Sequence, residues 1–206
     1  MTTLDEICIR CGADKASVHT NGGHDYARHY DAAFSPMRSS PVKLLEIGVD
    51  QGASIRAWLE YFPHGKIFGV DNARCPLIGN SRYTFESGDQ RRPEFWIEFT
   101  GKHGTAWDII IDDGGHYADM VIVAFGCLWP CVKPGGLYCV EDLGTGYPGY
   151  VQGRVQCNEV YLKNCIPAGW PNHKDHLKNL VDDVNLGREI DSISFSKELA
   201  IIRKAK

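Results

Sequence analysis

Short apolar runs rich in β-branched residues alternate along the chain with longer segments of helical periodicity. The apolar runs predict strands at residues 42–49, 66–71, 83–89, 107–113 and 133–142. Apolar residues at helical spacing predict helices at residues 55–62, 92–102 and 118–132, with one or two more within residues 155–184. Two closely spaced strands, at residues 189–196 and 198–204, are expected to form a hairpin.

This alternation predicts an α/β fold, a Rossmann-like doubly wound sheet that is mostly parallel and has an antiparallel C-terminal hairpin. A chain of 206 residues is long enough for one domain. We expect residues 1–206 to form it, with residues 1–40 as a helical lead-in or lid and residues 41–206 as the α/β core. In open sheets of this kind, ligands bind outside the carboxyl ends of the strands, where several polar clusters of this sequence are expected.

Composition and charge exclude several classes of function. The formal net charge of −4, with Lys and Arg scattered except in IIRKAK, argues against nucleic acid as a partner. Apolar runs are too short to cross a membrane, and the acidic start MTTLDEICIR does not resemble a signal peptide, so a cytoplasmic protein is expected. The eight cysteines are expected to be reduced, and the pair Cys8 and Cys11 lacks the second pair of a zinc site.

The sequence LEIGVDQGAS, at residues 45–54, predicts a turn that binds a ligand at the start of a helix. Glu46 ends a strand, Gly48 and Gly52 allow close approach of the backbone, and Ser54 lies at the helix start. Asp71 follows about 20 residues later, where a carboxylate can accept hydrogen bonds from ribose hydroxyls. A tight turn without a ligand is the alternative.

The identity of the nucleoside ligand is constrained by Asp50, which stands where a dinucleotide fingerprint requires its second glycine. A carboxylate there would repel a pyrophosphate, which disfavours a nicotinamide-dependent oxidoreductase. The charge favours a cofactor that carries a sulfonium and an amino acid.

The sequence IIIDDGGH, at residues 109–116, ends a buried strand with two carboxylates, two glycines and a histidine. Asp113 and the pair Glu141 and Asp142 end adjacent predicted strands, and three such carboxylates would not stay ionised together without a cation. Oxygen ligands suit magnesium, which can accept two oxygens of a diol. His116 is a candidate general base because histidine titrates near neutral pH. Helix capping by Asp112 and Asp113 is the plain alternative.

The glycine turn, Asp71, SGDQ and the aspartates of the fourth strand resemble class I S-adenosylmethionine-dependent methyltransferases. The resemblance implies S-adenosylmethionine as cofactor, with the methionine moiety near the glycine turn, the ribose on Asp71 and the adenosine near Asp89 and Gln90. The cofactor-binding residues that we predict are Glu46, Gly48, Gly52, Ser54, Asp71, Asp89, Gln90 and Asp112.

The combination of DDGGH with PGGLYCVEDLGTGY resembles magnesium-dependent sugar O-methyltransferases, which include macrolide deoxysugar and methylated-mannose polysaccharide enzymes. The resemblance implies that Asp113, Glu141 and Asp142 bind magnesium and that His116 is the base. A sugar hydroxyl of a glycoside, oligosaccharide or polysaccharide precursor is the implied acceptor. Two positions depart from these relatives near the expected acceptor site: Asp119 replaces a frequent histidine, and Gly146 replaces a frequent serine.

Aromatic residues near the expected acceptor site could bind a sugar or form a lid. The N-terminal sequence ADKASVHTNGGHDYARHYDAAF resembles the family's lead-in, which implies such a role for Tyr26 and Tyr30. Tyr147 and Tyr150 in GTGYPGYVQG, and later Trp170, fit a mobile lid and a plain surface loop equally well.

Three other functions stay open from the sequence: a catechol-type O-methyltransferase, which uses the same metal chemistry, a nicotinamide-dependent oxidoreductase, and a binding module without catalysis. An exposed sheet edge and the habit of the family make a homodimer the expected assembly.

Overall fold

The structure is a computed structural model, and it describes residues 2–20, 22–73, 78–146, 151–152, 155–156 and 171–206. The chain divides into two compact units, Met1–Ser87 and Gly88–Lys206. Among the residues described, no helix combines the length and the hydropathy that a membrane span requires.

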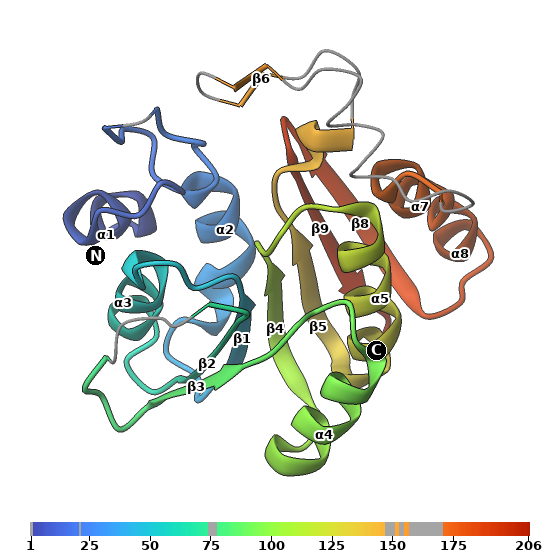
Figure 1. The fold of residues 1–206 in the computed structure, drawn as a ribbon, viewed down its shortest axis with the longest axis horizontal. Helices are drawn as coiled ribbons and strands as arrows, with labels where there is room; N and C mark the ends of the chain where they lie inside the picture. Colours follow the sequence, from blue (N-terminus) through green and yellow to red (C-terminus); the bar gives the residue numbers. More distant parts are fainter. Residues whose placement is uncertain (1, 21, 74–77, 147–150, 153–154, 157–170) are drawn as a thin grey trace. The chain divides into compact units, whose positions relative to one another are not determined.

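The first unit contains a parallel sheet in the order β3-β2-β1. Helix α1 begins at a capping box, in which Thr3 and Glu6 satisfy each other's backbone N–H groups, and ends at Gly12 in the left-handed region. It packs against α2 and α3 (Figure 1). The elements of this unit are α1 (Leu4–Cys11), α2 (Ala27–Phe34), the 3₁₀ helix η1 (Ser35–Met37), β1 (Lys43–Ile47), α3 (Ala53–Tyr61), β2 (Lys66–Asp71) and β3 (Tyr83–Ser87).

An aromatic cluster forms part of the core of the first unit. The ring of Tyr30 stacks on Phe34 with a centroid distance of 4.9 Å and meets Trp58 edge-on at 5.7 Å. All three side chains are fully buried. Aromatic pairs of this geometry stabilise a fold beyond the area that they bury, so α2 is tied to α3 by these contacts.

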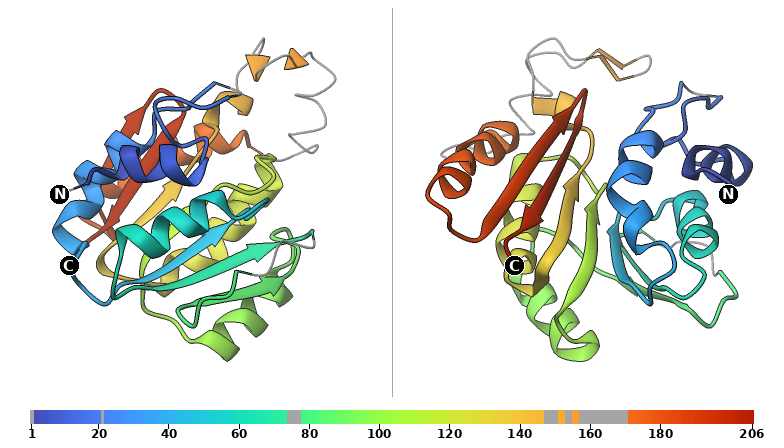
Figure 2. Two further views of the ribbon diagram at one scale, coloured as in Figure 1. Left: turned by 90° about the vertical axis from the view of Figure 1, so that its left-hand side faces the viewer. Right: turned by 180° about the vertical axis from the view of Figure 1, so that it is seen from behind.

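The second unit contains a mixed sheet in the order β4-β5-β9-β8, in which only β4 and β5 are parallel (Figure 2). The antiparallel pairing of β8 with β9 confirms the predicted C-terminal hairpin. The elements are α4 (Pro93–His103), β4 (Trp107–Asp112), α5 (Ala118–Leu128), η2 (Trp129–Cys131), β5 (Val132–Val140), η3 (Leu143–Gly146), the paired β6 (Val151–Gln152) and β7 (Val155–Gln156), α7 (His173–Asn179), α8 (Val181–Asn185), β8 (Ile190–Ser196) and β9 (Leu199–Lys204).

Most predicted elements are confirmed, and the differences lie at their boundaries. Helix α5 ends at Leu128 instead of residue 132, because Pro130 cannot continue the backbone hydrogen bonds of an α-helix and the chain turns through η2. Helices α7 and α8 confirm the helices expected within residues 155–184, whereas residues 155–156 form strand β7. Helices α1 and α2 lie within residues 1–40, and the role of this segment as a lead-in or lid remains a prediction.

Candidate active site

The turn after β1 has a backbone conformation that suits close approach to a ligand. Gly48, Asp50 and Gly52 all have left-handed backbones, with φ of 88°, 44° and 73°. The N–H of Gly48 donates to the carbonyl of Val70 at 2.8 Å and so ties the turn to β2. Aspartate is one of the few residues that tolerate this conformation at low cost. Asp50 therefore keeps a glycine-like turn even though it carries a side chain.

Asp71, at the end of β2, holds the glycine turn through its carboxylate. Oδ2 accepts hydrogen bonds from the N–H groups of Val49 at 2.8 Å and Asp50 at 3.2 Å, and Oδ1 accepts one from Ala73 at 2.8 Å. Hydrogen bonds from N–H groups to a carboxylate are stronger than those between neutral groups. Asp71 thus fixes the turn, and its contact with a ribose remains a prediction.

Glu46 is a buried carboxylate at the end of β1. The hydroxyl of Ser54 donates to Oε2 at 2.8 Å, and Nζ of Lys15 lies 3.5 Å from Oε1. The side chains of Lys15 and Glu46 are 1% and 0% exposed. The segment before α2 therefore contributes a buried counter-charge to this strand end, a contact that the sequence did not reveal.

In the second unit, Asp112 takes part in the hydrogen bonds that hold the DDGGH turn. Its carboxylate accepts hydrogen bonds from Nε2 of Gln90 at 3.1 Å and from the hydroxyl of Tyr138 at 3.4 Å. Oε1 of Gln90 in turn accepts from the N–H of Gly115 at 3.0 Å. Burial raises the pKa of Asp112 to about 6, although the hydrogen bond from Gln90 and the charge of His116 lower it. These contacts build the turn, and a cofactor role for Asp112 and Gln90 remains a prediction.

Neighbouring side chains leave no space for a Cβ atom at the two glycines of this turn. A Cβ atom on Gly114 would overlap the side chain of Gln90, and one on Gly115 would overlap that of Met120. Asp89 stabilises the turn that precedes α4, since its Oδ1 accepts a hydrogen bond from the N–H of Arg91 at 2.9 Å. Close packing of backbone on side chain therefore fixes the path from β4 to His116.

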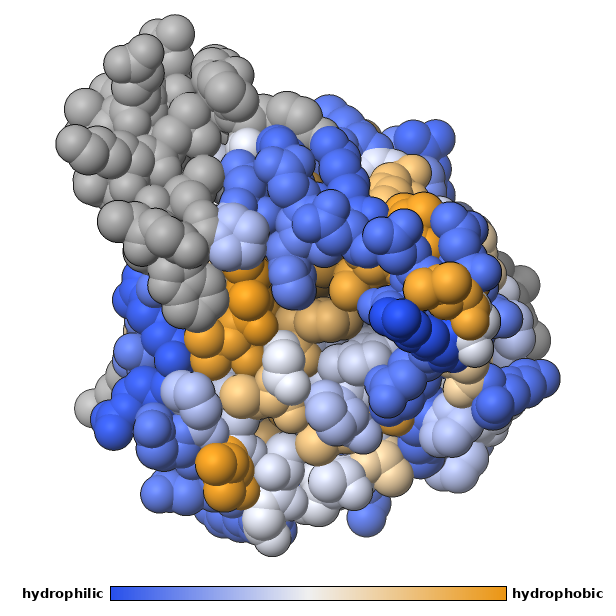
Figure 3. Space-filling view, turned by 90° about the vertical axis from the view of Figure 1, so that its right-hand side faces the viewer, coloured by the Kyte–Doolittle hydropathy of each residue, from blue (hydrophilic) through white to orange (hydrophobic). Residues whose placement is uncertain are grey.

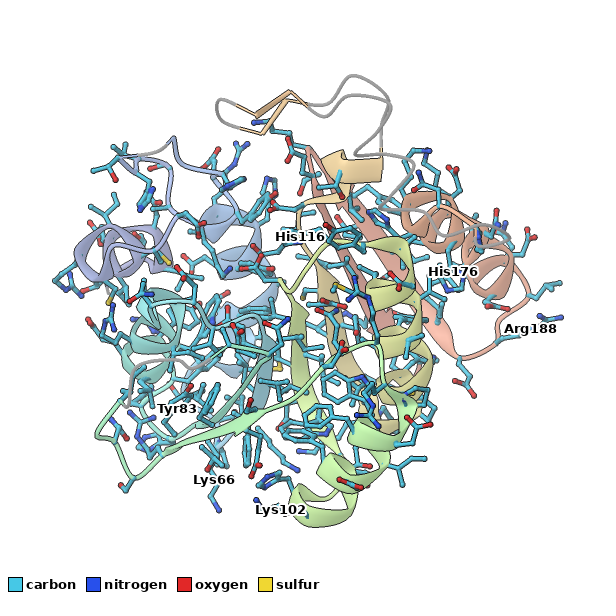
Figure 4. The ribbon with its side chains drawn as sticks, in the orientation of Figure 1. Lys66, Tyr83, Lys102, His116, His176 and Arg188 are labelled. Carbon is cyan, nitrogen blue, oxygen red and sulfur yellow. The ribbon has the colours of Figure 1, made fainter. Side chains whose placement is uncertain are left out.

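Asp113, His116 and Asp142 lie together at the carboxyl ends of β4 and β5. One ligand atom from each lies within 4.8 Å of the others, and Nε2 of His116 is 3.4 Å from Oδ2 of Asp142. Figure 4 labels His116 in the segment between β4 and α5. Glu141 is 3% exposed and does not belong to this group. Two carboxylates form a donor set that fits magnesium, which usually keeps several water ligands.

A buried hydroxyl and a buried imidazole lie behind this group. Oγ1 of Thr145 is 3.1 Å from the carbonyl oxygen of His116, 3.0 Å from that of Asp142 and 3.3 Å from Nε2 of His173. Burial is the main cause that lowers the pKa of His173 to about 4, and the charges of His116 and Lys174 lower it further. The short sequence after VED could have drawn attention to Thr145, whereas His173 lies far along the chain and carried no signal.

The depressed pKa of His173 predicts loss of stability in acid. A histidine with a lower pKa in the folded than in the unfolded chain binds fewer protons when folded, so protonation favours unfolding. Its contribution is fully present above pH about 6.5 and decreases as the pH falls towards 4, by up to about 3 kcal/mol. Urea unfolding at pH 7.0 and 4.5 measures the loss.

The control for this pH dependence is His173→Gln, which keeps an N–H donor but does not titrate. Other groups also titrate between these pH values, so the difference between the two proteins is the quantity of interest. Equal losses of unfolding free energy in both would contradict the assignment to His173.

The two departures from the sugar O-methyltransferase pattern have local explanations. Oδ2 of Asp119 pairs with Nε of Arg91 at 3.0 Å. Nδ2 of Asn172 donates to the carbonyl of Gly146 at 2.7 Å, and a Cβ atom on Gly146 would lie 2.5 Å from Oδ1 of Asn172. Gly146 therefore leaves the space that Asn172 occupies.

This packing predicts that Gly146→Ser destabilises the protein by about 1–3 kcal/mol, because overpacking displaces Asn172 from its hydrogen bond. Thermal unfolding of Gly146→Ser and of the double variant with Asn172→Ala tests it. The second substitution removes the obstructing amide, so adding it should restore part of the loss. A further loss of the same size as in Asn172→Ala alone would contradict the proposed clash.

The predicted aromatic residues fall into two groups. Tyr30 lies in the aromatic cluster described above, and Tyr26 is 2% exposed, with its ring centroid 5.1 Å from that of His24. Tyr30 therefore packs the core instead of presenting its ring to an acceptor. Tyr147, Tyr150 and Trp170 lie outside the described residues.

Comparison with known proteins identifies the family to which the chain belongs. No family model matches the chain. It is 32% identical, over 98% of its length, to the 8-demethyl-8-alpha-L-rhamnosyl tetracenomycin-C 2'-O-methyltransferase of Streptomyces olivaceus. It is 38% identical, over 62% of its length, to the mycinamicin VI 2''-O-methyltransferase of Micromonospora griseorubida. The chain is a homologue of sugar O-methyltransferases.

The solved structures assign the fold of this sugar O-methyltransferase homologue. The MycE methyltransferase from the mycinamycin biosynthetic pathway, solved in complex with Mg and SAH, matches 100% of the chain with a TM-score of 0.80 and 30% identity. The fold is therefore the Rossmann-like α/β fold of class I methyltransferases, as the sequence predicted. The homologue spans about half the length of these relatives, 54% of the Streptomyces enzyme and 55% of the MycE chain.

Proposed function

We propose that this chain is part of a magnesium-dependent O-methyltransferase that transfers a methyl group from S-adenosylmethionine to a sugar hydroxyl. The observation that carries the proposal is the group formed by Asp113, His116 and Asp142, because it pairs metal-binding carboxylates with a candidate base. The relatives named above support a sugar as acceptor, since one acts on a rhamnosyl compound and another on mycinamicin VI. A glycoside, oligosaccharide or polysaccharide precursor is the proposed acceptor class.

The cofactor is assigned to two sets of residues. In the first unit, the left-handed turn allows the backbone to approach the cofactor closely, and Asp71 is assigned to the ribose. In the second unit, Asp89, Gln90 and Asp112 are assigned to the adenosine. S-adenosylmethionine supplies the electrophilic methyl group when bound. The residues assigned in the first unit are Glu46, Gly48, Gly52, Ser54 and Asp71.

Asp113 and Asp142 are assigned to the metal, with Glu141 as the third carboxylate that the family resemblance implies. Bound magnesium supplies a charge that favours the ionised form of an acceptor hydroxyl. Nε2 of His116 takes the proton of that hydroxyl while the oxygen bonds to the methyl carbon and the sulfonium bond breaks. The carboxylate of Asp142, 3.4 Å from Nε2, stabilises the imidazolium that results.

Assembly and location are proposed on separate grounds. The single domain, residues 1–206, is supported by the match of the whole chain to one solved structure. A homodimer is supported by apolar side chains on α8, β8 and the turn between them, where Val181, Leu186 and Phe195 are 44%, 62% and 45% exposed. Figure 3 shows apolar patches on this side of the molecule. The proposed location is the cytoplasm. It is supported by the free thiols of Cys11, Cys127 and Cys139, because thiols stay reduced in that compartment.

Methyl transfer to a panel of acceptors tests the function. The panel contains deoxysugar glycosides and catechols, each incubated with saturating S-adenosylmethionine and with magnesium or a chelator. Formation of S-adenosylhomocysteine with glycosides, and its loss with chelator, is the expected result. Turnover of catechols alone would exclude the sugar acceptor, and turnover that the chelator does not change would exclude the metal mechanism.

Light scattering of the purified protein measures the proposed dimer.

A further inference from the structure

Two residues of the proposed metal centre have backbones that are unusual for their type. His116 and Asp142 have φ of 57° and 54°, in the left-handed region that non-glycine residues seldom adopt. Such conformations persist only where the surrounding structure holds them. The contacts that hold these two backbones therefore determine where the two side chains point.

The carbonyl oxygens of both residues meet at one hydroxyl. Oγ1 of Thr145 is 3.1 Å from the oxygen of His116 and 3.0 Å from that of Asp142, and the N–H of Thr145 also donates to Asp142 at 3.1 Å. The side chain of Thr145 is fully buried. One buried hydroxyl thus bridges the turn after β4 and the turn after β5.

The hydrogen bonds around Thr145 indicate which ring nitrogen of His173 carries the proton. A threonine hydroxyl has a single proton to donate, and the two carbonyls already compete for it. If Nε2 of His173, 3.3 Å away, accepted that proton, neither carbonyl would receive it, so we assign the N–H of His173 to Nε2, which donates to Oγ1. Nδ1 is left as an acceptor and has no hydrogen-bond partner among the described residues. This tautomer directs the hydroxyl proton of Thr145 towards the two carbonyls.

His173 is held in place by the start of α7. Asn172 caps this helix through the N–H of Lys174 at 3.0 Å, and its Nδ2 donates to the carbonyl of Gly146 at 2.7 Å. His173 is 1% exposed. Two adjacent residues at the helix start therefore fasten η3, the element that follows Asp142.

We propose that Thr145, oriented by His173, is a positioning residue that holds Asp142 and His116 in the geometry that magnesium binding requires. The inference rests on the proposed function, since it assumes that this group binds the metal. Thr145 lies behind the ligands and acts through their backbones. Substitutions behind a metal's direct ligands commonly lower metal affinity by about 10- to 100-fold.

The matched pair Thr145→Ala and Thr145→Ser isolates the hydroxyl. Both variants lose the γ-methyl group, and only serine keeps the oxygen. Calorimetric titration with magnesium chloride should show an affinity at least about tenfold lower for Thr145→Ala and within about threefold of the wild type for Thr145→Ser. Affinity for S-adenosylhomocysteine should change by less than about twofold in both. Thr100→Ala is the control. It removes a hydroxyl that donates to the carbonyl of Trp96 within α4, and it should leave magnesium affinity unchanged.

A second pair keeps the test decisive if Thr145→Ala does not fold. His173→Leu removes the donor to Oγ1, whereas the amide of His173→Gln can replace it. We expect magnesium affinity to fall in His173→Leu and to be largely restored in His173→Gln.

Equal magnesium affinity in the wild type, Thr145→Ala and His173→Leu would overturn the inference and leave the proposed function intact. A wild type that binds S-adenosylhomocysteine but not magnesium would overturn the metal-dependent function itself. Loss of magnesium binding in Thr145→Ser as large as in Thr145→Ala would also overturn the inference, because packing and not the hydroxyl would then be responsible.

Discussion

His116→Asn is expected to lower kcat for methyl transfer by about 10²- to 10⁴-fold, the usual contribution of a positioned general base. Asparagine cannot accept the proton, yet it tolerates the left-handed backbone that His116 adopts, with φ of 57°. The KM for S-adenosylmethionine should stay close to that of the wild type. Initial rates with the best acceptor of the panel, at saturating magnesium, measure the effect.

The control for this prediction is His116→Ala, which loses the base and also strains the backbone. Similar kcat values for the two variants would assign the loss to proton transfer. A large loss in His116→Ala alone would assign it to the conformation of the turn. A wild-type rate in His116→Asn would exclude His116 as the base.

The sequence predicted the sheet because its strands combine β-branched residues with short length and end in polar clusters. It also predicted that Asp113 and Asp142 would lie together, since the carboxyl ends of paired parallel strands meet at one edge. Glu141, adjacent to Asp142, does not belong to the group in the structure. Strand β5 ends at Val140 and Asp142 has a left-handed backbone with φ of 54°, so the alternation of a regular strand does not predict which side chains meet there.

Contacts between distant segments could not be predicted in the same way. The role of Thr145 depends on His173, which no periodicity or motif connects to the turn after β5. Tyr30 has a sequence context that suits a lid, but its burial against Phe34 and Trp58 depends on how α2 packs on α3. Periodicity shows which face of an element is apolar, whereas the partner of that face is a property of the folded chain.

Asp50 shows how a departure from a motif can leave the backbone unchanged. The missing glycine left the geometry of the turn open, and the structure gives Asp50 a φ of 44° between two glycines that also have positive φ. The N–H of Asp50 is used by the carboxylate of Asp71, which stabilises this conformation. The conformation of this turn therefore depends on the strand end that accepts its N–H groups as well as on its glycines.

Lys15→Met is expected to destabilise the protein by about 3–5 kcal/mol, because it leaves the buried carboxylate of Glu46 without its counter-charge. Nζ of Lys15 lies 3.5 Å from Oε1 of Glu46, and neither side chain has appreciable contact with solvent. Methionine keeps the length and the apolar stem of lysine, so lost packing contributes little. Urea unfolding at pH 7 without cofactor measures the change, which keeps any effect on cofactor binding out of the result.

Two further variants separate the buried charge from other causes. In Lys15→Met with Glu46→Gln the uncompensated charge is gone, so most of the stability should return, whereas additive losses would show that the ion pair is not the cause. Arg188→Met breaks an exposed pair with Asp183, in which the arginine side chain is 63% exposed, and should cost less than about 1 kcal/mol. A loss in Lys15→Met no larger than this would mean that water reaches Glu46 and that the segment before α2 does not seal the end of β1.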